Sequence, residues 1–275
     1  MHIDINEKCE KELQVCIEYC IRILRGLDHS NPVNEEKIYQ QQFLIRLFRH
    51  VNTIQKLRNG FNYEGVSDHD AAALLLVMRS ILESHLIFFY IFINPQSKAE
   101  NEIRFMCWKR EGLMSRQIIN PTNHEHVLKK KKELKQIEDL FLSIRNNCKF
   151  NNLSRHHSDR RSFESSFERK GTWRPSWKKI MLLMGHSKYK TETLYSFLSG
   201  HVHSEYSNYM QQLVMLRDNL TSENINTYTE IILPTINAFI YHIGKSMDIL
   251  NLFSEEELTA LKNWELINAK PENDS

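Results

Sequence analysis

The sequence is poor in the two residues that most often interrupt helices, with 8 glycines and 6 prolines among 275 residues. Sandwiches and barrels built from many short strands need both residues in their turns, so these folds are disfavoured. Apolar residues still make up 41% of the chain, which is enough for a buried core. Because Leu, Ile, Lys, Glu and Gln are abundant, we predict an all-α protein, a multi-helix bundle.

Cysteines are few: the sequence has 5, an odd number, and contains no C-x-x-C motif. This pattern argues against a disulfide framework and against a zinc ribbon. The first residues, "MHIDINEKCEKELQVC", are charged throughout and lack the apolar core of a signal peptide. We therefore expect a cytoplasmic protein with reduced, buried thiols.

A strong charge of one sign is also missing, since the formal net charge is +2. The whole chain is therefore not a generic binder of polyanions, and any surface for nucleic acid must be a local patch. The sequence contains no glycine-rich phosphate loop and no internal repeat.

Helical periodicity runs through most of the chain. We predict one helical domain over 1–268, a long basic loop or insertion at about 146–174, and a disordered tail at 269–275. Asn34, Ser67 and Ser254 are the expected starts of three helices, with Asp70 as the capping-box partner of Ser67. The predicted helices cover about 4–27, 34–60, 67–93, 97–118 and 123–146, then resume near 175 and 190, at 222–252 and from 254.

The segment 71–93, "AAALLLVMRSILESHLIFFYIFI", is long enough to cross a membrane. Arg79, Glu83 and His85 lie near its centre, and a charge there costs about 2.5–3.5 kcal/mol. We therefore predict a buried helix of a water-soluble protein, without a membrane partner.

Arg79 and Glu83 form an i, i+4 pair in this most apolar helix. An apolar pair of similar volume is often at least as stable as a buried ion pair, so stability alone explains this pair poorly. Two interpretations stay open: the pair fixes helix register, or it preorganises the Arg79 guanidinium for a phosphate or carboxylate.

A second polar stripe lies in "LYSFLSGHVHSEY", residues 194–206. On a continuous helix, Tyr195, Ser199, His203 and Tyr206 fall within about 80° of each other, while His201 points about 160° away from His203. The two histidines then cannot share a metal, so we predict neither a metal site nor another cofactor. An imidazole beside an arginine suits acid–base chemistry on a phosphodiester, and a core histidine is the alternative.

The predicted insertion combines basic and aromatic residues, as in surfaces that bind single-stranded nucleic acid. A soluble loop whose rings pack onto the bundle is the alternative. The candidate substrate-binding residues are Arg160, Arg161, Trp173, Arg174 and Trp177.

Two motifs carry a family resemblance: R-S-x-x-E in "LLLVMRSILESHLIFFYI", and Y-x-x-x-S-x-x-x-H in "YSFLSGHVHSEY". In this order and separation they resemble an uncharacterised all-helical bacterial family of unknown function, over about residues 40–250. The chain is more distantly similar to the HEPN superfamily of helical-bundle ribonucleases and nucleotide-binding proteins. Active members of that superfamily usually dimerise and cut RNA without metal, often with an R-N-x-x-x-H-x-Y motif. Here Leu198 occupies the arginine position, so Arg79 would have to supply the charge.

The resemblance implies a HEPN-like RNA-targeting effector, a metal-independent endoribonuclease that acts as a homodimer and as a toxin in bacterial antiphage defence. In it, Arg79 would bind the scissile phosphate, Glu83 would orient Arg79, and His203 would act as acid or base. Ser199 and Tyr195 would position the substrate or the imidazole. Two alternatives stay open: a non-enzymatic module that binds a protein partner of the same defence or toxin–antitoxin system, or a bundle that binds a nucleotide signal.

Overall fold

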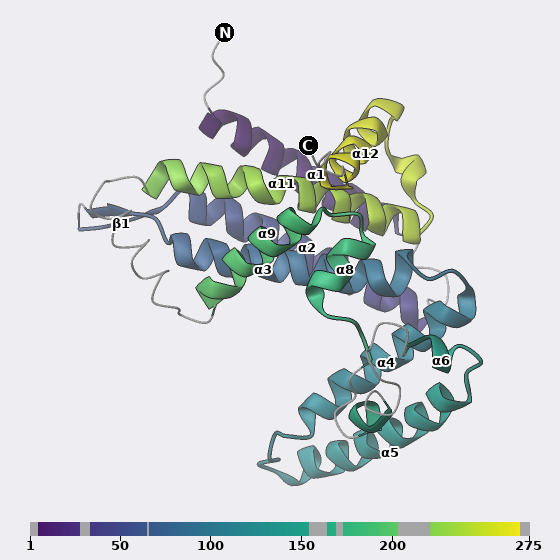
Figure 1. The fold of residues 1–275 in the computed structure, drawn as a ribbon. Helices are drawn as coiled ribbons and strands as arrows, with labels where there is room; N and C mark the ends of the chain where they lie inside the picture. The colour runs from purple at the N-terminus through teal and green to yellow at the C-terminus, as the bar shows by residue number, and fades with distance from the viewer. Residues whose placement is uncertain are drawn as a thin grey trace. The chain divides into compact units, whose positions relative to one another are not determined.

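The described part of the chain is mostly helical, as the computed structural model in Figure 1 shows. The structure describes residues 5–27, 34–64, 66–153, 164–168, 173–202 and 221–269. Its contacts divide the chain into two compact units, which we describe separately: unit 1 comprises residues 1–89 and 177–275, and unit 2 comprises residues 90–176. The prediction of an all-α multi-helix bundle is confirmed, with one short β-hairpin as an addition.

A four-helix bundle forms the centre of unit 1. Its helices are α1 (Ile5–Gly26), α2 (Glu35–Arg58), α3 (Ala71–Phe88) and α11 (Thr221–Ser246). Each packs against its neighbours in the order α1, α2, α3, α11 and back to α1, and α2 also contacts α11 (Figure 1). The core between them is apolar, with Leu13, Leu44, Met78 and Ile236 completely buried.

Side-chain caps fix where several of these helices begin. Asn34 accepts a hydrogen bond from the backbone N–H of Lys37, and this confirms the predicted start of α2. The start of α3 differs from the prediction, because Asp70 itself is the cap and accepts from the N–H of Ala73. Ser67 instead lies in the strand β2 (Val66–Asp68), which pairs antiparallel with β1 (Phe61–Tyr63). The hairpin begins after Gly60, whose φ of 67° ends α2 in a conformation that glycine adopts without strain.

Helix α3 is the core helix of unit 1. By length and composition, Ala71–Ile93 could cross a membrane, a test that a buried helix of a water-soluble protein also passes, and 56% of its most apolar window is buried inside the protein. Its contacts with α2, α11 and α9 account for that burial. The helix ends in one π-helical turn, η1 (Phe89–Ile93), just before the Asn94–Pro95 step that the sequence marks as a stop.

Two shorter helices cover α3. Helix α8 (Trp177–Leu183) and helix α9 (Lys188–Val202) pack against each other, and both contact α3. Helix α12 (Glu255–Ala269) follows the 3-10 turn η3 (Leu250–Leu252) and packs against α11. It begins with the predicted capping box, in which Ser254 and Glu257 each accept a hydrogen bond from the other's backbone N–H.

Unit 2 is built on a helical hairpin of α4 (Lys98–Arg116) and α5 (His124–Asn146). The side chains of Ser97 and Asn123 cap these two helices. The short α6 (Phe150–Leu153) packs against α5, and residues 164–168 are also helical. Part of the predicted loop at 146–174 is therefore helical.

Two predicted boundaries stay predictions. The two compact units do not decide whether residues 1–268 fold as a single domain, because a domain is defined by independent folding. The predicted tail begins at 269, where α12 ends, and residues 270–275 lie outside the described residues.

Candidate functional site

The polar stripe of α3 contains an ion pair, as its i, i+4 spacing predicts. Arg79 Nε donates a hydrogen bond to Glu83 Oε1 at 2.8 Å. The side chain of Arg79 is 14% exposed and that of Glu83 is 29% exposed, so the pair lies at the edge of the core. At this edge the Arg79 guanidinium is held in one orientation and is partly desolvated.

Helix α9 brings two of the predicted residues to this pair. The ring of Tyr195 lies 5.9 Å from the Arg79 guanidinium, within cation–π range. Arg79 Nη1 also donates to the backbone carbonyl of Ser199 at 3.5 Å, a long and weak hydrogen bond. Arg79, Glu83, Tyr195 and Ser199 therefore form one cluster between α3 and α9, which we call the Arg79 cluster.

His203, the expected acid or base, lies outside the described residues. It follows Ser199 by four residues in the sequence, just beyond the last described residue of α9. The catalytic roles assigned to the cluster therefore stay predictions. Chemically, the described part offers a positive charge, a carboxylate that orients it, and a phenol.

The predicted substrate-binding residues are not all available for stacking or ionic contacts. Trp173 is completely buried in unit 2, where it packs on Tyr90 and donates from Nε1 to Glu111 at 2.9 Å. A ring in this position cannot stack on a base, so Trp173 acts in packing here. Arg174 is half-buried in unit 2 and donates to the carbonyl of Pro175. Trp177 is half-buried at the start of α8 in unit 1, while Arg160 and Arg161 lie outside the described residues.

A buried histidine pair joins α3 to α11. His85 Nε2 and His242 Nδ1 are 2.8 Å apart in a hydrogen bond, and both rings are 1% exposed. His85 also stacks on Phe239 with a centroid distance of 4.8 Å. Burial lowers the pKa of His85 well below its ordinary range, and the nearby imidazoles of His242 and His186 lower it further. His85 is thus neutral and buried in the core between α3 and α11.

His186 belongs to the same buried region. It follows Gly185, whose φ of 91° closes α8 in a Schellman motif, with the His186 N–H bonded to the Met181 carbonyl at 3.1 Å. Burial lowers the pKa of His186 to about 4, and the neighbouring Lys190 contributes in the same direction. His85 and His186 therefore support the structure of the bundle as neutral groups.

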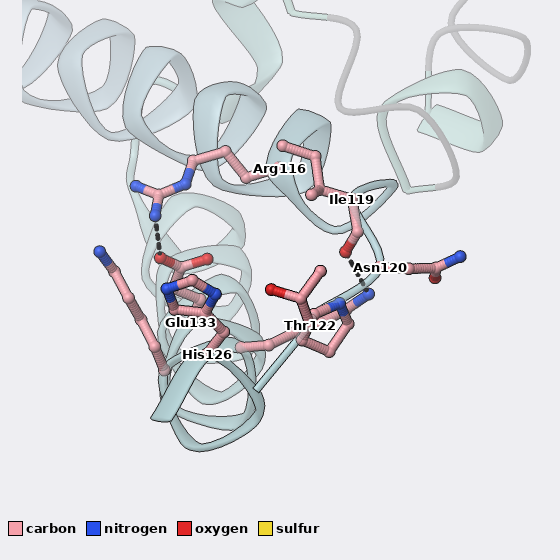
Figure 2. Close-up of a pocket in the computed structure, with 9 residues that line it drawn as sticks. Arg116, Ile119, Asn120, Thr122, His126 and Glu133 are labelled. Atoms are coloured by element: carbon pink, nitrogen blue, oxygen red, sulfur yellow. Dashed lines mark hydrogen bonds and ion pairs between the residues drawn. The ribbon is translucent and has the colours of Figure 1, made fainter. Parts of the chain in front are cut away.

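The turn between α4 and α5 contains a hollow of about 330 Å³ (Figure 2). Arg116 of α4 forms an ion pair with Glu133 of α5 at 2.8 Å across it. Lys130 donates to the carbonyl of Ile119 at 3.1 Å on the other side. We call this hollow the hairpin pocket; it is lined by Arg116, Ile119, Asn120, Pro121, Thr122, His126, Lys129, Lys130 and Glu133.

Metal-ligating side chains do not gather anywhere in the part of the chain that the structure describes, where no group of three or more His, Cys, Asp or Glu residues could hold an ion. The expectation that no metal takes part stays a prediction, because His203 lies outside that part.

Sequence reasoning missed both the histidine pair and the hairpin pocket. The histidine pair joins two helices far apart in the sequence, and no local pattern marks it. One feature of the sequence lies at the pocket, the run "KKKKELK" at 129–135, and such a run usually indicates a solvated charged face. Its significance depends on Arg116 and Glu133 meeting across the turn.

Comparison with known proteins adds one finding. The sequence model of a family described as of unknown function (DUF5677) matches residues 39–219, more than half of the chain. Among curated proteins and solved structures, none matches. The matched region includes all of α3 and α9 and therefore the whole Arg79 cluster. The chain belongs to this family of unknown function, DUF5677.

Proposed function

We propose that the protein is a HEPN-like, metal-independent endoribonuclease that uses Arg79 and His203. The observation that carries the proposal is the contact between Arg79 of α3 and Ser199 of α9, because it joins the two motifs that the sequence separates. The proposal includes a cytoplasmic homodimer that acts on RNA in bacterial defence, with a regulatory protein partner from the same system.

The proposed reaction needs a cation at the phosphate and one group that transfers protons. The RNA 2′-hydroxyl attacks the adjacent phosphorus, the bond from phosphorus to the 5′-oxygen breaks, and a 2′,3′-cyclic phosphate and a 5′-hydroxyl end result. His203 takes the proton from the 2′-hydroxyl or gives one to the leaving 5′-oxygen, and water serves the other transfer. Arg79 stabilises the charge that develops on the non-bridging oxygens.

The geometry around Arg79 supports this role. Its bond to Glu83 is short and fixes the guanidinium, whereas its 3.5 Å bond to the Ser199 carbonyl is weak. A phosphate oxygen makes a stronger, charge-assisted bond and can replace that carbonyl. The Tyr195 ring beside the guanidinium holds the side chain in place and brings a hydroxyl group on the same helix as Ser199.

A second candidate function is a non-enzymatic module that regulates or binds a protein partner. It is favoured by the low exposure of Arg79, 14% of its side chain, and by the partners that it already has within the protein. In that case the Arg79 cluster fixes the register of α3 against α9.

One experiment separates the two functions. The wild type, His203→Ala and Arg79→Lys are purified and incubated with single-stranded RNA in the presence of EDTA. We expect the wild type to cut RNA, and His203→Ala to be slower by about 10²–10⁴-fold, the usual contribution of a general acid or base. Arg79→Lys keeps the charge but loses the planar fork, so we expect a loss of rate without unfolding.

His201→Ala is the matched control, because it removes an imidazole from the same stretch of sequence. A substrate with a single 2′-deoxy nucleotide at the cut site should resist cleavage there. Intact RNA after incubation with the wild type, or equal rates for wild type and His203→Ala, would refute the nuclease and favour the non-enzymatic module.

A further inference from the structure

The hairpin pocket carries an excess of positive charge in a small volume. Three cationic side chains, Arg116, Lys129 and Lys130, line it together with one carboxylate, Glu133. Three positive charges against one negative charge leave a net charge of +2, apart from His126. The pocket belongs to unit 2, whereas the Arg79 cluster belongs to unit 1, and ligand binding in the pocket does not depend on the proposed nuclease activity.

Arg116 is held in place by a buried carboxylate. Glu133 is 8% exposed, pairs with Arg116 at 2.8 Å, and accepts a second bond from Gln117 Nε2 at 3.1 Å. Helix α5 buries just two side chains, and one of them is this carboxylate. Because an apolar residue would serve stability at least as well, the orientation of Arg116 is the better reason for Glu133. The Arg116 side chain stays 52% exposed, so part of the fixed guanidinium is open to a ligand.

Lys130 is fixed on the opposite side of the pocket. Its Nζ donates to the carbonyl of Gln117 at 2.7 Å and to that of Ile119 at 3.1 Å, at the C-terminal end of α4. An ammonium group has three N–H donors, and these carbonyls use two of them. Thr122 points toward the middle of the hollow, whereas Asn120 points away from it (Figure 2). Two fixed cations and a hydroxyl group thus surround one small space.

We propose that the hairpin pocket binds a phosphomonoester group. Its volume of about 330 Å³ is at the small end of ligand sites. None of the described residues that line it is Phe, Tyr or Trp, so it suits an anionic group better than a stacked base. A phosphomonoester dianion matches the net charge of +2 and accepts hydrogen bonds from both fixed cations. The group could belong to a small molecule or to the 5′ end of an RNA, and the chemistry of the pocket is the same for both.

The test measures binding to the full chain in two arms. The first arm compares adenosine 5′-monophosphate with adenosine by isothermal titration calorimetry. The second compares a 5′-phosphorylated and a 5′-hydroxyl form of one short 2′-O-methyl RNA, which cannot be cut through a 2′-hydroxyl, by fluorescence anisotropy. In at least one arm we expect the phosphorylated ligand to bind with a Kd below about 1 mM. This Kd should be at least about tenfold lower than that of the unphosphorylated form of the same ligand.

Two variants test the pocket itself. Lys129→Gln removes one exposed cation, and the double variant Arg116→Gln with Glu133→Gln removes the fixed guanidinium while keeping the net charge and a neutral hydrogen-bonding pair. Each should weaken the binding of the phosphorylated ligand by at least about tenfold. Lys131→Gln is the control, because Lys131 is exposed on the same helix and does not line the pocket. The affinity of the Lys131→Gln variant for the phosphorylated ligand should stay within about twofold of the wild-type value.

The outcomes decide both the site and the source of the phosphate. Discrimination in the first arm alone assigns the pocket to small phosphomonoesters, in the second alone to RNA 5′ ends, and in both to the phosphate group itself. Equal binding of the paired ligands in both arms overturns the proposal. So does an equal effect of Lys129→Gln and Lys131→Gln, or unchanged binding in the double variant that folds like the wild type.

Discussion

Acid should destabilise unit 1 through its buried imidazoles, and His186 gives the clearest case. In the unfolded chain a histidine has its ordinary pKa of about 6.5, so it takes up a proton below that pH. The buried imidazole of the folded protein stays neutral at the same pH. Because burial lowers the pKa of folded His186 to about 4, the two states differ in protonation between these two pH values. Above about pH 6.5 the imidazole is neutral in both states and has no effect.

The magnitude follows from the width of this window. The free energy of unfolding should fall by up to about 1.4 kcal/mol per pH unit below pH 6.5. Over the whole window the loss from His186 is about 3 kcal/mol, and it is complete once the pH is below the folded pKa. His85, whose pKa is also lowered by burial and by His242, adds a loss in the same direction.

Urea denaturation followed by circular dichroism at several values between pH 7.5 and 4.5 measures this dependence. In His186→Gln the decline below pH 6.5 should be shallower by about 1 kcal/mol per pH unit, whatever the variant's stability at pH 7.5. His124→Gln is the matched control, because His124 is exposed on α5 and its ring is in contact with water in both states. Parallel curves for the wild type and His186→Gln would refute the reasoning.

Two further predictions concern local features of the helices. Gly112→Ala should stabilise the protein by about 0.5–1 kcal/mol, because Gly112 lies inside α4 and an added Cβ meets no atom within 4 Å; an unchanged or lower melting temperature would contradict this. Asp70→Ala should cost about 1 kcal/mol by removing the 2.8 Å bond to the Ala73 N–H at the start of α3. Asp70→Asn, which keeps an oxygen acceptor, should retain most of that stability, and equal losses in both variants would argue against the cap.

Much of the secondary structure could be predicted because its determinants are local. Asn34 and the Ser254–Glu257 box act on backbone groups three residues away, and helical periodicity shows within a window of about 11–18 residues. The hairpin after Gly60 could not be predicted with the same rules. Its strands have three residues each, too few for an alternating pattern to stand out.

The contacts of the candidate site likewise include local ones, which can be predicted, and long-range ones, which cannot. The Arg79–Glu83 pair follows from local spacing alone, since residues four apart on a helix are neighbours whatever surrounds them. Three other contacts, of Ser199 with Arg79, His85 with His242, and Arg116 with Glu133, become visible in the folded structure alone. Those contacts depend on how helices pack, and packing depends on shape and volume summed over many side chains, which no local spacing contains. The same reason placed Trp173 in a core, although its neighbours in the sequence are basic and polar.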